Sequence, residues 1–122
     1  MPNLRPLDER VPIQEQLRDT TSPAILVNIF SVMPGDVEEF LAAWERDANW
    51  MKRQPGYIST QLHRGLAGSC VFLNYAVWES VAHFRQAFTH PEFRNAIATY
   101  PSNVVASPHL FAKVGVPNLC TN

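Results

Sequence analysis

Nine consecutive residues, Cys70 to Trp78, most constrain what this chain can fold into. Their sequence, CVFLNYAVW, contains no glycine or proline and consists mostly of β-branched, aromatic and aliphatic residues, which predicts a β-strand. Side chains alternate between the two faces of a strand. One face therefore carries Val71, Leu73, Tyr75 and Val77, and the other carries Cys70, Phe72, Asn74, Ala76 and Trp78. Because both faces are largely apolar, the sheet that contains this strand must be covered on both sides.

Asn74 and Trp78 are the polar exceptions on the second of these faces. A strand rises roughly 3.3 Å per residue, so the two side chains are about 13 Å apart along it. The amide and the indole N–H are neutral hydrogen-bonding groups in a surface that is otherwise apolar. This pair is therefore the first candidate for a functional site.

The elements before this strand follow from periodicity and turn residues. An apolar run at 24–33 predicts a strand, which contains one amide, Asn28. Apolar residues at helical spacing predict a helix over 37–53. Asp36 is a plausible N-cap for this helix, with Glu39 completing a near capping box.

Strands and helices continue to alternate along the chain. Alternating polarity predicts a strand over 57–64, which a glycine-containing hairpin joins to the central strand. Ser80 can cap a second helix, and Pro91 begins a further short helix or turn. The last strand is expected over 104–114, where Pro108 indicates an edge or a bulge.

The predicted order, β-α-β-β-α-β, is that of the ferredoxin-like fold, an α+β architecture with a four-stranded antiparallel sheet. Two helices can cover only one face of such a sheet, whereas the strands at 25–30 and 71–77 are apolar on both faces. An uncovered face of this kind would exceed the few hundred Å² of apolar patch that a soluble monomer tolerates. We therefore expect a homodimer, with an interface on the order of 2,000 Å² or more.

Length and composition set further bounds. A chain of 122 residues forms one domain, which we place at 23–115, between an N-terminal arm at 1–22 and a C-terminal tail at 116–122. A net charge of −1 gives no electrostatic basis for binding nucleic acid or an anionic membrane. No apolar run is long enough to span a bilayer, and the N-terminus lacks the apolar core of a secretory signal. Cys70 and Cys120 are not expected to form a disulfide, and we expect a cytoplasmic protein.

The common catalytic signatures are missing from the sequence. It has no CxxC pair, no HExxH, no GxSxG, no P-loop and no GxGxxG. The histidines come from four separate elements without the spacing of metal ligands, so we expect no metal site. They are His63, His83, His90 and His109. The carboxylates expected on the solvated face of the first helix are Glu38, Glu39 and Glu45.

Several short motifs, taken in order, resemble one family. They are the Pro-Gly-Tyr entry to a strand at 55–57, the Asn74-x-x-x-Trp78 strand, the helix with Phe84 and Phe88, and the HPEF sequence at 90–93. Over roughly three quarters of its length, from Ala24 to about Val114, the chain resembles the antibiotic biosynthesis monooxygenase domain, a family of dimeric α+β barrels. The motifs are more specific for this fold than for a substrate, because the scaffold hosts several activities.

The resemblance implies a pocket between the sheet face that carries Asn74 and Trp78 and the helices above it. It implies that O₂ oxidises a small, electron-rich aromatic of the anthrone or quinol type without flavin, metal or haem, because the substrate supplies the electrons. The Asn74 amide and the Trp78 indole would donate hydrogen bonds to the substrate oxygens, and His63 is a candidate proton acceptor. The side chains expected to bind the substrate are Asn28, Phe72, Phe84, Phe88 and Phe93.

Two alternatives stay open. Haem-degrading relatives share a strand Asn, a strand Trp and a helix His that binds iron. In this chain the corresponding candidates are Asn28, Trp78 and one of His83 or His90. The anthrone-oxidising relatives, by contrast, have a tyrosine where this chain has Phe84, so one phenolic hydrogen bond is missing here.

The second alternative is a dimer that binds a small apolar ligand without catalysing a reaction.

Overall fold

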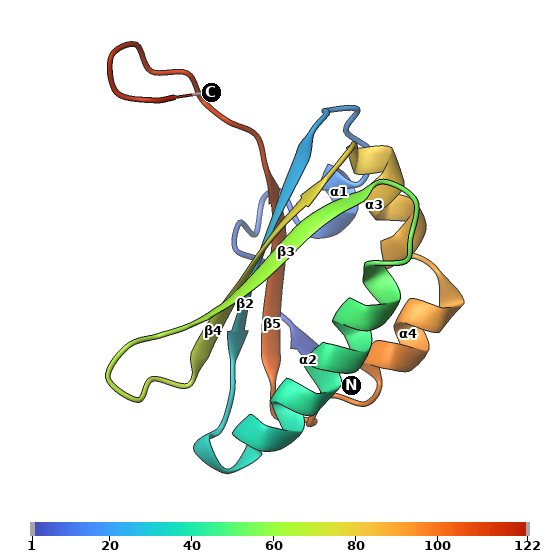
Figure 1. Ribbon diagram of the computed structural model, residues 1–122, viewed down its shortest axis with the longest axis vertical. Coiled ribbons are helices and arrows are strands. Elements are labelled where there is room, and N and C mark those ends of the chain that lie inside the picture. The colour runs from blue at the N-terminus through green and yellow to red at the C-terminus, as the bar shows by residue number, and fades with distance from the viewer. Residues whose placement is uncertain (1, 122) are drawn as a thin grey trace.

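A five-stranded sheet carries helices α2, α3 and α4 on one of its faces (Figure 1). The computed structural model describes residues 2–121. The strands are β1 (Asn3–Leu4), β2 (Ala24–Ser31), β3 (Tyr57–Arg64), β4 (Val71–Trp78) and β5 (Val105–Phe111). The helices are α1 (Ile13–Gln16), α2 (Val37–Met51), α3 (Val81–Phe88) and α4 (Pro91–Ile97), and a 3₁₀ turn, η1 (Pro34–Asp36), precedes α2. The strand order across the sheet is β1-β5-β2-β4-β3.

The two strands that are apolar on both faces, β2 and β4, are neighbours within the sheet. They pair antiparallel, with Asn28 opposite Asn74 and Ala24 opposite Trp78. β5 pairs antiparallel with β2, and β3 pairs antiparallel with β4. These four strands and their helices form the ferredoxin-like arrangement that the sequence predicts.

The sheet has five strands rather than the expected four, because the N-terminal segment adds a short one. β1 pairs with β5 in parallel, with Asn3 opposite Val105 and Leu4 opposite Ala106, so the sheet is mixed. Two residues are too few to show an alternating pattern, which is why the sequence does not predict this strand.

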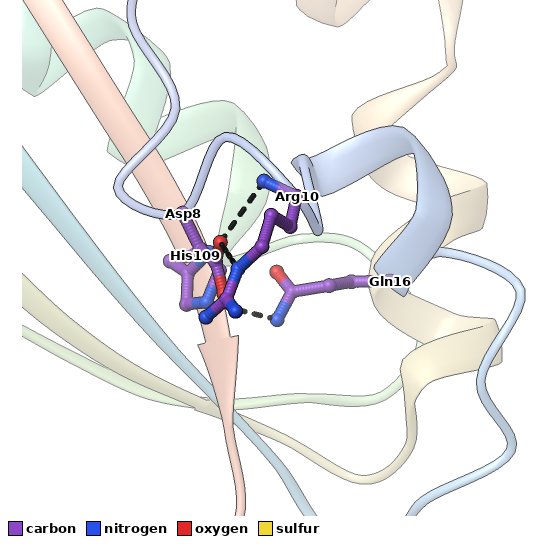
Figure 2. Close-up of polar contacts among 4 residues, drawn as sticks. All are labelled: Asp8, Arg10, Gln16 and His109. Atoms are coloured by element: carbon purple, nitrogen blue, oxygen red, sulfur yellow. Dashed lines mark hydrogen bonds and ion pairs between the residues drawn. The ribbon is translucent and has the colours of Figure 1, made fainter.

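The N-terminal segment also occupies the outer edge of β5 farther along (Figure 2). The Gln16 side chain donates to the Leu110 carbonyl and accepts from the Leu110 amide, both at 2.9 Å, as a neighbouring strand would. Figure 2 shows the same side chain beside His109, with 3.2 Å between the Gln16 amide nitrogen and His109 Nε2. In the loop before α1, Asp8 and Arg10 form an exposed ion pair. Backbone groups that an edge strand usually leaves open are thus partnered within the chain.

The helices that cover the sheet begin at different kinds of cap. Ser80 caps α3 as predicted, since its hydroxyl accepts from the His83 amide at 3.1 Å. At the start of α4, the ring of His90 accepts from the Glu92 amide at 3.0 Å. The capping box expected for α2 is wrong, because Asp36 ends the 3₁₀ turn and its side chain makes no capping hydrogen bond.

Two clusters of buried side chains fill the space between the sheet and the helices. The first surrounds Trp78 and Phe84 and receives Ile13 and Leu17 from the N-terminal segment. The second lies toward the opposite ends of β2 and β4, and its aromatic members are Phe30, Phe40, Phe72 and Tyr100. The N-terminal segment is therefore part of the core of its own chain.

An irregularity in β3 changes which of its side chains share a face. The register against β4 shifts between Tyr57 and Ser59, and Ile58 between them is 53% exposed. Simple alternation predicts Tyr57 and Thr60 on opposite faces. With this bulge, both lie on the face that the helices cover.

The opposite face of the sheet is open and largely apolar, since α2, α3 and α4 all lie on the other side (Figure 1). On β4 it carries Val71 and Tyr75, which are 44% and 40% exposed, and on β5 it carries Phe111, which is 43% exposed. Its members from β2 are Ile25, Val27 and Ile29. This face corresponds to the one that the sequence analysis expects a second copy to cover.

Within residues 2–121, no helix combines the length and the apolar character needed to cross a membrane. Cys70 and Cys120 are free thiols.

Candidate functional site

A cavity lies between the helix-covered face of the sheet and helices α2, α3 and α4. It encloses about 530 Å³ that no protein atom occupies, counted out to where it opens to solvent. Much of the wall is apolar. Its polar side chains are Asn28, Asp47, Tyr57, Thr60 and Asn74, joined by the indoles of Trp44 and Trp78.

The two strand amides, Asn28 and Asn74, sit opposite each other in the pairing of β2 with β4, and both line the cavity. The Thr60 hydroxyl donates to Asn74 Oδ1, so the N–H groups of that amide have no partner among the described residues. Asn28 Oδ1 is buried and accepts no hydrogen bond from them either. Buried polar atoms are rarely left unpaired in folded proteins, so the unpaired atoms of these two amides mark this part of the wall as a candidate polar site.

Aromatic rings form a continuous wall from β4 to α4. Trp78 is 1% exposed and meets Phe84 edge to face, with ring centroids 5.7 Å apart. The Phe88 ring lies 5.2 Å from Phe84, and the Phe93 ring lies 5.3 Å from Phe88. Tyr57 packs edge to face on Trp78 at 5.7 Å. The structure thus brings three of the expected substrate-binding residues, Phe84, Phe88 and Phe93, together with Trp78.

Helix α2 contributes one carboxylate to the cavity, that of Asp47. Sequence reasoning misses this residue, because the acidic residues of the helix suggest a solvated face. A signal is nevertheless present, since Asp47 follows Trp44 by three residues and precedes Met51 by four. This is the spacing of the buried stripe of a helix, where a charged residue is unusual.

The two oxygens of this carboxylate have different surroundings. Asp47 Oδ2 accepts from the Tyr100 hydroxyl at 2.8 Å, whereas Oδ1 is sealed from solvent without a partner, although the residue as a whole is only half-buried. Burial disfavours the charged form and raises the pKa of Asp47 to about 6, against the lowering effect of the Tyr100 hydrogen bond. Burial, followed by the nearby charge of Asp47, raises the pKa of the Tyr100 phenol, so Tyr100 remains the donor.

Two residues expected at the site, His63 and Phe72, do not line the cavity. His63 is paired with Leu73 on the open face, where its Nδ1 lies 3.3 Å from the Leu73 carbonyl oxygen. Phe72 shares a face with Asn74 but packs against Phe40 in the second cluster, with ring centroids 4.9 Å apart. The structure therefore places neither His63 nor Phe72 in the cavity wall.

The helix histidines also lie outside the cavity wall. The Ser80 hydroxyl lies 2.7 Å from Nδ1 of His83, and His90 caps α4. Neither supplies an iron ligand to the cavity, so the residues present do not fit the set required for haem there. In the part of the chain that the structure describes, no three His, Cys, Asp or Glu side chains are grouped to hold a metal ion.

The cavity therefore combines neutral hydrogen-bond donors, an aromatic wall and one buried carboxylate whose pKa is close to neutrality. Neutral donors can stabilise an oxyanion, and such a carboxylate can accept a proton near neutral pH. Apolar walls exclude water and strengthen both interactions. The arrangement is suited to deprotonating a small acidic molecule and stabilising the resulting anion.

Comparisons with known proteins agree with this geometry. Residues 23–99 match the model of the antibiotic biosynthesis monooxygenase family. Among curated protein sequences, the comparison finds no match.

Several solved structures are similar to this chain. SnoaB, a cofactor-independent oxygenase from Streptomyces nogalater, is 26% identical, with a TM-score of 0.69 over 80% of this chain and 99% of SnoaB. A candidate monooxygenase from Shewanella loihica PV-4 is 30% identical, with a TM-score of 0.68 over 80% of this chain and 99% of that protein. A protein from Caulobacter crescentus CB15 is 20% identical, with a TM-score of 0.62 over 83% of this chain and 99% of its own, a likeness that concerns the fold alone.

Proposed function

The chain belongs to the antibiotic biosynthesis monooxygenase family, and from this we propose that it is an oxygenase that needs no cofactor. Its substrate is a small, electron-rich aromatic of the anthrone or quinol type, oxidised by O₂. The observation that carries the proposal is the cavity, where Asn28, Asn74 and Trp78 place polar groups in an aromatic wall. The likeness to SnoaB, itself a cofactor-independent oxygenase, supports the same reaction class.

The polar groups of the wall match the charge that develops in this reaction. An anthrone or quinol that loses a proton becomes an electron-rich enolate or phenolate, which can pass an electron to O₂. Thr60 fixes the carbonyl of Asn74, so the amide N–H groups face the remaining space as donors to the anionic oxygen. The indole N–H of Trp78 is a second donor, and both stabilise the anion without a metal.

The aromatic wall matches the shape of such a substrate. Flat rings pack against Phe84, Phe88 and Phe93 in the offset or edge-to-face geometries that aromatic pairs prefer. Removing the substrate from water in this wall also strengthens its hydrogen bonds to the two donors. The aromatic side chains thus position the substrate, and the two donors beside them stabilise its charge.

Haem is the alternative cofactor, and the positions of the histidines favour its absence. None of His63, His83, His90 and His109 is part of the cavity wall. Titration with haemin is therefore expected to give no Soret band of a protein-bound haem. A stoichiometric Soret shift, lost on substitution of one histidine, would contradict the proposal.

We also propose that the protein is a homodimer that covers the open sheet face. That face exposes Val71, Tyr75 and Phe111 in the single chain, and such apolar surface is normally buried. Two copies packed through it would enclose both sheets between layers of helices. Light scattering after size exclusion is expected to give twice the mass of the chain, and a monomer at micromolar concentration would contradict this.

Oxidation of anthrone tests the proposed activity. Oxygen consumption and quinone absorbance are measured in air-saturated buffer, and one O₂ is expected to be consumed per quinone formed. Asn74→Ala and Trp78→Phe are each expected to lower kcat/KM by roughly 10- to 100-fold, because each removes one donor to the anion. Asn49→Ala, which removes an exposed amide from α2, is the matched control and is expected to leave turnover unchanged.

The outcomes separate the candidate functions. Turnover that survives both substitutions would remove Asn74 and Trp78 from the mechanism. Saturable binding of anthrone with no oxygen consumption would identify a ligand-binding protein instead of an oxygenase.

A further inference from the structure

The Asp47 carboxylate needs an explanation that packing does not provide. It lies on the inner face of α2, four residues after the buried Ala43 and three before the buried Trp50, and lines the cavity with Trp44 and Met51. Its Oδ2 accepts from the Tyr100 hydroxyl, whereas its Oδ1 is sealed from solvent and receives no hydrogen bond from residues 2–121. A sealed carboxylate oxygen without a donor is costly to the folded state and is rarely retained without a role.

A second unpartnered acceptor lies in the same wall. Asn28 Oδ1 is also buried and also lacks a hydrogen bond from the described residues. Two residues of one cavity wall thus carry an acceptor without a donor, and a ligand that brings its own hydrogens can supply one to each after a small movement of the side chains. The Asn74 amide and the Trp78 indole supply donors in the same cavity. The wall therefore matches a molecule that carries both an acidic hydrogen and an oxygen atom.

We propose that Asp47 is the general base of the oxygenation proposed above, and that Tyr100 is the positioning residue that holds it. Oδ1 is sealed in the ligand-free chain, so the proposal includes a small turn of the carboxylate on substrate binding that brings Oδ1 to the acidic proton. This inference depends on the proposed function and assigns the role that His63 was expected to fill. Tyr100 is suited to its part because it is 4% exposed and packs between aromatic rings of the second cluster. Its hydroxyl holds Oδ2, which leaves Oδ1 as the oxygen free to accept a proton.

The reaction balances with O₂ as the oxidant and an anthrone as the reductant. Asp47 takes a proton from the methylene carbon opposite the ketone, and the electron pair of the broken C–H bond moves onto the ketone oxygen as an enolate. The enolate gives one electron to O₂, and the resulting radical and superoxide combine to form a carbon–oxygen bond. The hydroperoxide anion then takes back the proton from Asp47.

Loss of water completes the sequence. The second hydrogen of the former methylene leaves as a proton, the O–O bond breaks, and the hydroxide released combines with that proton. The products are a quinone and one water molecule, so one O₂ is reduced by four electrons. No other reductant enters.

The electrostatic surroundings allow Asp47 to act near neutral pH. Burial raises the pKa of its carboxyl to about 6, so most of it is ionised at pH 7 and yet it binds a proton more readily than an exposed carboxylate. Tyr57 from β3 is the other titratable side chain of the described wall, and β2, β4, β5, α3 and α4 contribute uncharged residues. Tyr100 contacts the carboxylate directly, and Arg46 on α2 acts on the Tyr100 phenol from a distance.

Anaerobic hydrogen exchange tests proton removal apart from oxygen chemistry. 1,8-Dihydroxyanthrone is incubated with enzyme in D₂O without oxygen, and exchange of its methylene hydrogens is followed by NMR against an enzyme-free sample. The wild type is expected to accelerate exchange, and Asp47→Asn is expected to lower both this exchange and aerobic kcat by about 100-fold or more. Glu45→Gln changes an exposed acid to an amide on the same helix, and is expected to stay within twofold of the wild type.

The pH profile separates a base from a structural residue. The rate is expected to rise with pH through an apparent pKa near 6, because the ionised form of Asp47 is the active one. In Tyr100→Phe the hydrogen bond that lowers the pKa of Asp47 is lost, so the apparent pKa of the pH–rate profile is expected to move to higher pH. Loss of a residue needed only for folding would lower the rate without changing the apparent pKa of the pH–rate profile.

Failure of this inference can be told from failure of the proposed function. If the wild type oxidises the anthrone and Asp47→Asn retains exchange and turnover, Asp47 is not the base while the function stands. If the apparent pKa of the pH–rate profile is unchanged in Tyr100→Phe, the positioning role of Tyr100 is refuted. If the wild type neither exchanges nor oxidises the anthrone, the proposed function fails and the inference falls with it.

Discussion

Replacing Asp47 by Asn is expected to stabilise the protein at neutral pH while it removes the proposed activity. A rise of the pKa from 3.8 to about 6 means that the folded state holds the ionised carboxylate at a cost of about 3 kcal/mol, at about 1.4 kcal/mol per pKa unit. An amide of the same shape carries no charge and still accepts from the Tyr100 hydroxyl. We expect a gain in the free energy of unfolding of about 1–3 kcal/mol at pH 7.5, allowing for local relaxation.

The size of this stabilisation depends on pH, because Asp47 ionises at different pH in the folded and unfolded chain. Below about pH 4, Asp47 is protonated in both the folded and the unfolded chain, so its ionisation costs nothing. Between about pH 4 and pH 6 the unfolded chain loses the proton first, and the wild type loses stability as pH rises. The advantage of Asp47→Asn should therefore be small at pH 4 and complete above pH 7.

Urea unfolding followed by tryptophan fluorescence measures this difference at the two pH values. Protein concentration is held fixed, because association would itself change the apparent stability. Glu45→Gln, the exposed change on the same helix, is the control and should alter the free energy of unfolding by less than about 0.5 kcal/mol. An equal gain at pH 4 and pH 7.5, or a loss at pH 7.5, would refute the reasoning.

Three further predictions follow from contacts outside Asp47. Thr60→Val removes the hydroxyl that fixes Asn74 and is expected to lower kcat/KM on anthrone by about tenfold, with Thr60→Ser restoring it; an unchanged value would show that Asn74 needs no such support. Tyr75→Glu places a charge on the open face and is expected to convert a dimer to a monomer in light scattering, whereas an unaltered mass would place the interface elsewhere. Ser80→Ala removes the cap of α3 and is expected to cost about 1 kcal/mol in urea unfolding; no loss would mean that the His83 amide finds another partner.

Much of the site follows from the period of a strand. Asn74 and Trp78 share a face because they are an even number of residues apart, and no tertiary information is needed to place them there. The helix that follows must cross back over that face, which brings Phe84 and Phe88 above Trp78. Local pattern and chain connectivity together are sufficient for this part of the cavity.

Register is what the local pattern leaves undetermined. His63 is the proton acceptor that the resemblance implies, but the pairing sets Leu62 opposite Asn74 and puts His63 opposite Leu73, on the other face. A shift by one residue reverses the face of every side chain in a strand, and the bulge at Ile58 is such a shift. The sequence indicates neither the register of β3 against β4 nor the bulge at Ile58.

Phe72 and Asp47 show two further limits. Phe72 lies on the predicted face of β4. Its contact with Phe40 depends on how α2 crosses the strands, which local sequence pattern does not determine. Asp47 resembles its solvated neighbours in type, and only its spacing from Trp44 marks it as buried. The residue type alone predicts an exposed position for Asp47, whereas its position in the helical repeat predicts that it faces the core.

The closed edge of β5 has a consequence for how far copies of this chain can assemble. With β1 and Gln16 already bound along that strand, another chain cannot pair with the same backbone groups of β5. At the far side, β3 is interrupted by its bulge. The proposed dimer uses the broad open face instead, and a two-fold pairing of that kind would bury the apolar area of both molecules at once. The proposed pairing would therefore end at two subunits, and removing the first 22 residues would uncover the edge of β5 as a second surface for association.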